Sequence, residues 1–236
     1  MAGLASLRLA RDAACMARMR LPPEPQSKLI HERSYTVRAY REGPDRLLLR
    51  GMVNDQKPSG IYFPDDPEPL DVHLMVVDLL LDYPSLEIVA ADVVMEVTPH
   101  STCTRIEVEY QKLVGLSIAR GFSRKVKDLF GGPSGCTHIG ALLQAMAPVA
   151  VQSMWSMRSL QASESGTSVT LDKNASAEAR RAAMSFNLNT CHVWEEAGEF
   201  AQAALAGEFV EIPLWATARL KKLGRSASSW GDITGD

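Results

Sequence analysis

One short segment joins a glycine-rich loop to a cysteine and a histidine, which are residue types suited to chemistry. The segment reads Gly131-Gly132-Pro133-Ser134-Gly135-Cys136-Thr137-His138. A loop of this kind can point backbone N–H groups at an anion, and the dipole of a following helix adds partial positive charge. It has neither the GKS or GKT ending of a Walker loop nor the GxGxxG pattern. We therefore expect a carboxylate, phenolate or phosphate at Gly132, Gly135, Thr137 and His138, with a tight interhelical turn as the alternative.

A second candidate is His73, which the alternation of a predicted strand places on the same face as Met75 and Val77. An imidazole on an apolar face is often a core histidine with one hydrogen bond. The functional alternative is a titratable group in an apolar pocket, where burial lowers the pKa and keeps the ring neutral as a base.

Arg38 and Tyr40 form a third candidate, because residues two apart in a strand share one face. Both could project into one pocket with Tyr35 or Asp55 nearby. Exposed pairing on the surface is the alternative, since arginine and tyrosine usually lie at least partly in water.

Three short clusters bring cysteine and histidine close together in the sequence. Thiolates and imidazoles are ligands that zinc or an iron–sulfur centre would accept. The spacing matches no usual zinc pair and each cluster falls on a different predicted element, so buried free cysteines are the alternative. The candidate ligands are Cys103, Cys136, Cys191, His100, His138 and His192.

Composition excludes several classes of protein. The 236 residues are 46% apolar, which is enough for a sizeable core. The net charge of -3 gives no broad positive field, so we expect no nucleic-acid partner. The apolar runs are too short for a membrane-spanning helix, and four scattered cysteines without a CxxC pair favour the cytoplasm.

The elements that must position these residues change character along the chain. Apolar residues alternate in two predicted hairpins, at 34–52 around Gly43-Pro44-Asp45 and at 72–98 around Tyr83-Pro84-Ser85, with a loop at 54–69 between them. On the second strand of the second hairpin, Val89 begins a face that continues through Ala91 and Val93. We therefore expect an N-terminal antiparallel sheet of about four strands, with one face in water.

After Pro99 the apolar spacing becomes helical, from Leu113 to Leu129. We expect a helix from an N-cap at Thr137 to about Arg158, a polar excursion at 163–176, and short helices at 177–186 and 195–206. Strands followed by helices predict an α+β fold, with helices covering the sheet. The predicted units are a flexible arm at 1–33, one domain at 34–224 and a frayed tail at 225–236.

The chain resembles a bacterial family, domain-of-unknown-function family twenty-eight eighty-nine, over about residues 34–207. The resemblance rests on a His73 strand, a Pro99/Cys103 turn and four short strings, of which the last is the most specific. The strings are Leu113-Val114-Gly115-Leu116, Gly121-Phe122, Gly131-Gly132 and Gly135-Cys136-Thr137-His138. Most members have no assigned activity. The resemblance extends to γ-formaldehyde lyases, which open the phenylcoumaran ring of lignin-derived aromatic dimers.

The resemblance implies a lyase that needs no redox cofactor and acts on an aromatic small molecule. His73 would be the base, Arg38 and the loop at 132–138 would stabilise a phenolate, and Tyr40 or Asp55 would orient the base. Two other functions stay open: a non-enzymatic metal or iron–sulfur protein using the ligands above, and a small-molecule binding accessory subunit. The sequence leaves a homo-oligomer possible.

Overall fold

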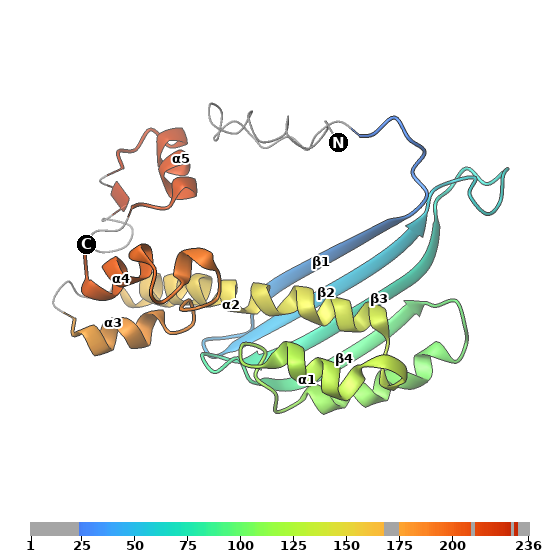
Figure 1. Cartoon of the computed structure of the whole chain (residues 1–236), viewed down its shortest axis with the longest axis horizontal. Helices are drawn as coiled ribbons and strands as arrows, with labels where there is room; N and C mark the ends of the chain where they lie inside the picture. Colours follow the sequence, from blue (N-terminus) through green and yellow to red (C-terminus); the bar gives the residue numbers. More distant parts are fainter. Residues whose placement is uncertain (1–23, 168–174, 209–210, 228, 231–236) are drawn as a thin grey trace.

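The computed structural model describes residues 24–167, 175–208, 211–227 and 229–230. Its centre is a four-stranded antiparallel sheet in the order β1-β2-β3-β4 (Figure 1). The strands are β1 (Glu32–Arg41), β2 (Arg46–Lys57), β3 (Leu70–Asp82) and β4 (Ile88–Val97). Helices follow the strands, so the predicted α+β fold is confirmed.

Alternation of apolar residues places one face of the sheet in the core. On β3, Met75, Val77, Leu79 and Leu81 are all buried, as the period of two predicts. On β4 the predicted face is correct at Ala91, Val93 and Met95 but wrong at Val89. The register shifts between Leu80 and Leu81, so Ile88 takes the buried position instead.

Strand β2 is longer than its sequence suggests, because its pairing with β3 continues to Lys57. The predicted loop at 54–69 is therefore wrong over its first four residues. As a result Asp55 lies in the sheet, directly opposite His73 of β3 and Arg33 of β1. This register assembles the polar cluster described below.

Between the sheet and the long helix, the chain forms two short helical segments rather than one continuous helix. They are the 3₁₀ helix η1 (Cys103–Leu113) and α1 (Phe122–Phe130). The intervening residues are not helical, contrary to the predicted spacing: Gly115 has φ +86°, and Ser117 forms a bridge with Glu87 beside the start of β4. A second short 3₁₀ segment, η2 (Gly132–Ser134), follows α1.

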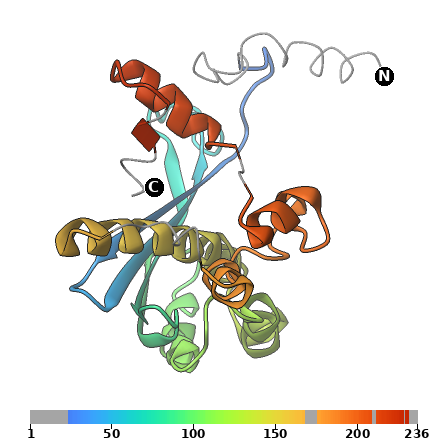
Figure 2. The ribbon, with the colours of Figure 1, turned by 90° about the vertical axis from the view of Figure 1, so that its left-hand side faces the viewer.

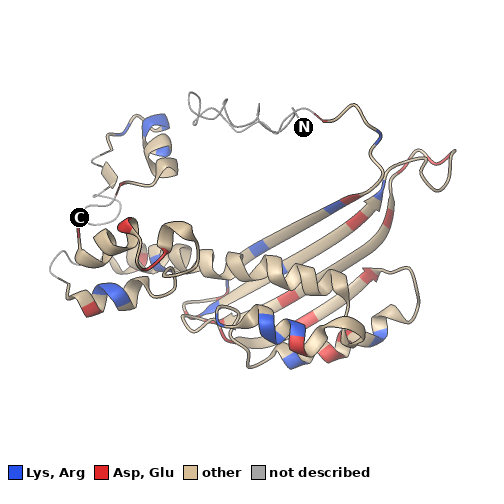
Figure 3. Cartoon of the chain, viewed as in Figure 1, with Lys and Arg blue, Asp and Glu red and all other residues tan. Residues whose placement is uncertain are grey.

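Helix α2 (Thr137–Ser165) covers β1, β2 and β3, while η1 lies against β4 (Figures 1 and 2). Figure 3 shows that the part of α2 before Arg158 carries no charged residue. Its buried side chains include Leu142 and Met146, which approach Gly51 closely: a Cβ on Gly51 would lie 2.6 Å from the Met146 sulfur. The small residue on β2 thus lets helix and sheet come together.

Both predicted ends of α2 need correction. The N-cap is Cys136, not Thr137, which is the first helical residue. The helix also continues past Arg158 to Ser165, where Gly166 ends it with φ +65°. The first residues of the predicted 163–176 excursion are therefore helical, and residues 168–174 lie outside the described part of the chain.

Helices α3 and α4 lie alongside the half of α2 that is remote from Thr137 (Figure 1), where Arg158 of α2 donates a hydrogen bond to the Ala183 carbonyl. Helix α3 starts at Ala177, as predicted. Helix α4 starts four residues later than predicted, because residues 195–198 form a turn that ends at Gly198, the N-cap of α4. Helix α5 was not predicted. These elements are α3 (Ala177–Met184), η3 (His192–Trp194), α4 (Glu199–Ala206) and α5 (Leu214–Lys222).

The predicted terminal segments fall largely outside the described residues. Of the predicted arm at 1–33, residues 1–23 are not described, and the last two residues belong to β1. Of the predicted tail at 225–236, residues 228 and 231–236 are not described. Over the described residues, no helix combines the length and apolar character needed to cross a membrane.

Candidate functional site

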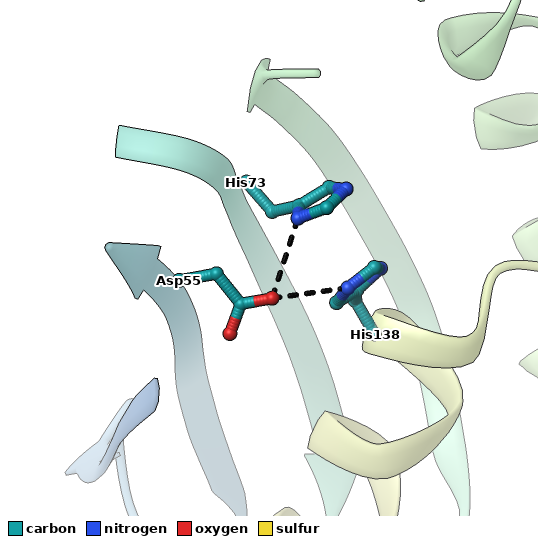
Figure 4. Close-up of side chains that lie close together, drawn as sticks. All are labelled: Asp55, His73 and His138. Carbon is teal, nitrogen blue, oxygen red and sulfur yellow. Dashed lines mark ion pairs between the residues drawn. The ribbon is translucent and has the colours of Figure 1, made fainter. Parts of the chain in front are cut away.

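Three polar side chains from three elements converge at one end of the sheet. Asp55 lies near the end of β2, His73 lies near the start of β3, and His138 is the second residue of α2. Cross-strand pairing of Asp55 with His73 brings the first two together. Figure 4 shows both imidazoles directed at the same carboxylate.

The carboxylate of Asp55 is the buried centre of this cluster, since only 2% of the residue is exposed. Its Oδ2 lies 3.1 Å from His138 Nε2 and 3.3 Å from His73 Nδ1. The two rings stack with centroids 3.9 Å apart and planes at 27°. His73 Nδ1 is buried but is not aligned for a hydrogen bond with the carboxylate. The second nitrogen of each ring points away from Asp55 (Figure 4).

A guanidinium from β1 holds Asp55 in its charged form. Arg33 donates from Nε to Oδ1 at 2.5 Å and from Nη2 to Oδ2 at 2.6 Å, which is a bidentate pair. His31 Nε2 lies 3.6 Å from Oδ1. The Arg33 hydrogen bonds lower the pKa of Asp55 from 3.8 to about 2, against the opposing effect of burial. Asp55 is therefore an anion at neutral pH.

His138 contacts both the carboxylate and a thiol. Its Nδ1 lies 3.6 Å from the Cys136 sulfur, on the opposite side of the ring from Asp55. Burial is the main cause that lowers the pKa of His138 below 6.5, and the neighbouring His73 lowers it further. Asp55 opposes the shift without reversing it. The ring is therefore neutral at pH 7, able to donate from one nitrogen and accept at the other.

The two imidazoles form part of the wall of a cavity of about 800 Å³. Its lining includes the apolar side chains of Met75, Met95, Ile106 and Leu129, and Arg105, Glu109 and Lys112 of η1 add charge. The loop before α2 forms another side, because Pro133, Ser134, Gly135, Cys136 and Thr137 also line it. A space of this size fits an aromatic small molecule.

A buried tyrosine fixes the loop against the core. The Tyr110 hydroxyl accepts a hydrogen bond of 2.9 Å from the Cys136 N–H, and its ring stacks on Phe130 with centroids 4.5 Å apart. Burial raises the pKa of Tyr110 to about 12, so the phenol stays neutral. The Cys136 N–H is thus engaged in a hydrogen bond within the protein and is not directed at a ligand.

The glycines of the loop have different roles. Gly135, Thr137 and His138 line the cavity, whereas Gly132 is not among its lining residues. Gly132 has φ +58°, and a Cβ there would meet no atom within 4 Å. At Gly135 a Cβ would lie 2.3 Å from the Phe130 carbonyl oxygen. Close packing on α1 therefore requires glycine at 135, and backbone conformation favours it at 132.

We expect Gly135→Ala to lower the free energy of unfolding by about 3 kcal/mol, because the added methyl clashes with backbone that cannot rotate away. Gly132→Ala is the matched control, with an expected loss of about 1 kcal/mol from its left-handed backbone alone. Urea unfolding of both variants tests this. Equal losses at the two positions would contradict the role assigned to Gly135.

The structure does not bring Arg38 and Tyr40 to this site. Both lie in β1, opposite Arg50 and Leu48, on the sheet face that turns away from the helices. Arg38 is exposed, and Tyr40 is 41% exposed. The expectation that they project into one pocket with Tyr35 or Asp55 nearby is therefore wrong, because Tyr35 and Asp55 belong to the opposite face of the sheet.

Arg38→Ala is expected to leave turnover within about twofold of wild type, as for an exposed substitution remote from the cavity. The measurement is the rate at which the protein converts a phenylcoumaran, the substrate class that the resemblance implies, at equal concentrations of folded protein. A loss of tenfold or more would return Arg38 to the mechanism.

The structure also separates the predicted metal ligands. Cys103, Cys136 and His138 line the cavity, whereas Cys191 and His192 lie exposed at the α4 side of the molecule. His100 is exposed and is not a lining residue. The predicted six-residue ligand set is thus not assembled, because its cysteines belong to elements at opposite ends of α2.

A different set has the spacing of metal ligands. Asp55, His73 and His138 each offer one ligand atom, and in the described part of the chain these atoms lie within 4.8 Å of one another. Arg33, however, already holds both oxygens of Asp55. A divalent cation would face that guanidinium directly, so we interpret the cluster as an acid–base site with a fixed internal cation.

Arg33 and His31 are the site residues that sequence reasoning missed. The predicted arm included both, although Arg33 continues the alternation of β1 through Tyr35 and Val37. Extending the first hairpin by that alternation would have placed Arg33 beside Asp55.

Fold and site together define an α+β protein with a carboxylate–imidazole cluster in the wall of a cavity. The chain belongs to the family described as "Protein of unknown function (DUF2889)", whose model matches residues 31–152. The match ends earlier than the predicted extent of 207, but it includes Asp55, His73 and His138. No curated protein and no solved structure matches the chain.

Proposed function

We propose that this protein is a carbon–carbon lyase that releases formaldehyde from a lignin-derived aromatic dimer, opening a phenylcoumaran ring to a stilbene. The observation that carries the proposal is an imidazole, His73, in a cavity wall with a buried anionic carboxylate 3.3 Å behind its Nδ1. With that nitrogen directed at Asp55, the other is available to a substrate. Such an arrangement is typical of a general base.

The reaction needs a base, a cationic region and apolar walls, but no external oxidant. Electron release from the phenolate of the substrate breaks the aryl ether bond and gives a quinone methide. His73 then takes the proton of the γ-hydroxymethyl group, and the Cβ–Cγ bond breaks. Formaldehyde leaves, and the electron pair of that bond forms the stilbene double bond and restores the aromatic ring. The proton on His73 goes to the departing aryl oxide.

The cavity provides groups for each requirement. Met75, Met95 and Ile106 offer apolar surface for two aromatic rings, while Arg105 and Lys112 place positive charge where a phenolate can lie. Lys112 is also paired with Glu109, so Arg105 is the cation we assign to the phenolate. Positive charge held in place favours the charge that develops as the aryl ether breaks.

The direct test incubates the purified full-length chain with a phenylcoumaran and measures formaldehyde and stilbene in equal amounts. Stoichiometric appearance of both supports the proposal. Metal analysis of the same preparation separates the competing class of protein. A bound metal at one equivalent with no turnover would replace the lyase by a metal-binding protein, and specific binding without turnover or metal would favour an accessory subunit.

A further inference from the structure

Cys136 and His138 line the cavity, the buried Asp55 lies behind His138, and the proposed lyase reaction does not use the cysteine. The Cys136 sulfur lies 3.6 Å from His138 Nδ1, and His138 Nε2 lies 3.1 Å from Asp55 Oδ2. Nucleophile, base and orienting carboxylate thus follow one another in the order of a catalytic triad. They come from the start of α2 and the end of β2.

The surroundings of Cys136 favour a reactive thiol. The residue is the N-cap of the 29-residue helix α2, where the partial positive charge of the helix dipole favours negative charge that develops in a reaction. It is only partly buried and lines the cavity, so a small molecule can reach it. The hydrogen bond from its N–H to Tyr110 holds the backbone in position.

The histidine has the protonation that this role requires. Asp55 is held as an anion by Arg33, and it faces His138 Nε2. A proton on Nε2 leaves the lone pair on Nδ1, which is the nitrogen beside the sulfur. The His73 ring stacks on one face of the His138 ring and limits the rotation of that ring.

We propose that Cys136 is a nucleophilic thiol activated by His138 and Asp55, and that it adds reversibly to aldehydes in the cavity. The thiol proton moves to His138 Nδ1, and the sulfur forms a bond to the carbonyl carbon. The carbonyl π electrons move to oxygen, which takes the proton back from His138. The product is a thiohemiacetal, with no net oxidation or reduction. The choice of formaldehyde as the aldehyde rests on the proposed lyase function.

Alkylation by iodoacetamide tests the nucleophile independently of any lyase activity. Peptide mass spectrometry of the full chain at pH 7 gives a separate rate for each cysteine, with exposed Cys191 as internal reference. We expect Cys136 to react about fivefold faster than Cys191, because His138 Nδ1, 3.6 Å from the Cys136 sulfur, can take the thiol proton as the sulfur attacks. A Cys136 rate equal to or below that of Cys191 would overturn the proposal.

His138→Gln removes the base, and we expect it to bring the Cys136 rate to or below that of Cys191. Cys103→Ser is the matched control, because Cys103 lines the same cavity but is not part of the triad. If His138→Gln fails to fold, Asp55→Asn retains the histidine and should lower the Cys136 rate in the same direction. An unchanged Cys136 rate in the folded variant would contradict activation by the triad.

Formaldehyde itself tests the aldehyde. Preincubation of the wild-type chain should slow alkylation of Cys136 several-fold more than alkylation of Cys191, and gel filtration should restore the rate. Equal slowing at both cysteines would overturn aldehyde addition at this site. Fast alkylation and selective protection without stilbene formation would reject the lyase proposal and retain the nucleophile. Stilbene formation without fast alkylation and selective protection of Cys136 would reject the nucleophile and retain the lyase proposal.

Discussion

Replacing His73 by alanine is expected to lower the rate of formaldehyde release by about 10²–10⁴-fold, the contribution of a positioned general base. The variant loses the group that takes the γ-hydroxyl proton, while Asp55 keeps its bidentate pair with Arg33. The residue is 21% exposed, so removal of the ring leaves space that water can enter. The measurement is single-turnover formaldehyde release under saturating substrate.

His192→Ala is the matched control, because it removes an exposed histidine of η3 that is remote from the cavity. Its turnover should equal that of wild type. His73→Gln, which retains polarity but cannot act as a base near pH 7, should lose as much activity as His73→Ala. Wild-type turnover in either His73 variant would remove this residue from the mechanism.

Asp55→Asn is expected to lower the free energy of unfolding by about 2 kcal/mol at pH 7 and turnover by about 10²-fold. The substitution keeps the shape of the side chain but leaves Arg33 without its anion. Breaking a fully buried ion pair lowers the free energy of unfolding by more than this. The Arg33 side chain is 36% exposed, so water solvates part of the guanidinium that Asp55→Asn leaves without its anion. Turnover falls because the imidazoles lose the charge that orients them.

The loss of stability caused by Asp55→Asn should become smaller as the pH falls. The pKa of Asp55 is lowered from 3.8 to about 2 in the folded chain, so its ion pair stabilises the fold above pH 3.8. That contribution is lost as the pH falls through about 2. The difference in the free energy of unfolding between wild type and Asp55→Asn should therefore narrow between pH 4 and pH 2.

Urea unfolding at several pH values measures this difference. Asp78→Asn is the matched control, because Asp78 pairs with Arg50 on the exposed face of the same sheet. An exposed pair contributes little, so this variant should remain close to wild type. A constant difference for Asp55→Asn across the acid range would show that its stabilising effect is not ionic.

The sequence alone predicted the α+β class and the four-stranded antiparallel sheet. Alternation in β3, with Met75, Val77, Leu79 and Leu81 on one face, predicted the sheet and its buried side. The change to helical spacing at 139–150 predicted α2, although the predicted N-cap at Thr137 and the predicted end near Arg158 were both wrong. These features are local, because period and turn chemistry depend on neighbouring residues.

Local patterns were less informative where long-range pairing competes with them. The apolar spacing at 113–118 is compatible with a helix, but Ser117 pairs with Glu87 and Leu116 accepts a hydrogen bond from the Ile88 N–H. The Pro- and Gly-rich stretch after Asn54 indicates a loop, yet β2 continues to Lys57 because β1 and β3 both pair with it. Neither partner is evident from a short window of sequence.

The sequence by itself identified His73, Asp55, Cys136 and His138 as residues that could do chemistry. Only the tertiary structure decided that these four belong together, that Arg33 joins them, and that Arg38 and Tyr40 do not. The physical reason is strand register and helix placement. A one-residue change in parity moves a side chain to the other face of a sheet, and the start of α2 lies at this end of β2 because the helix packs on the sheet through the core.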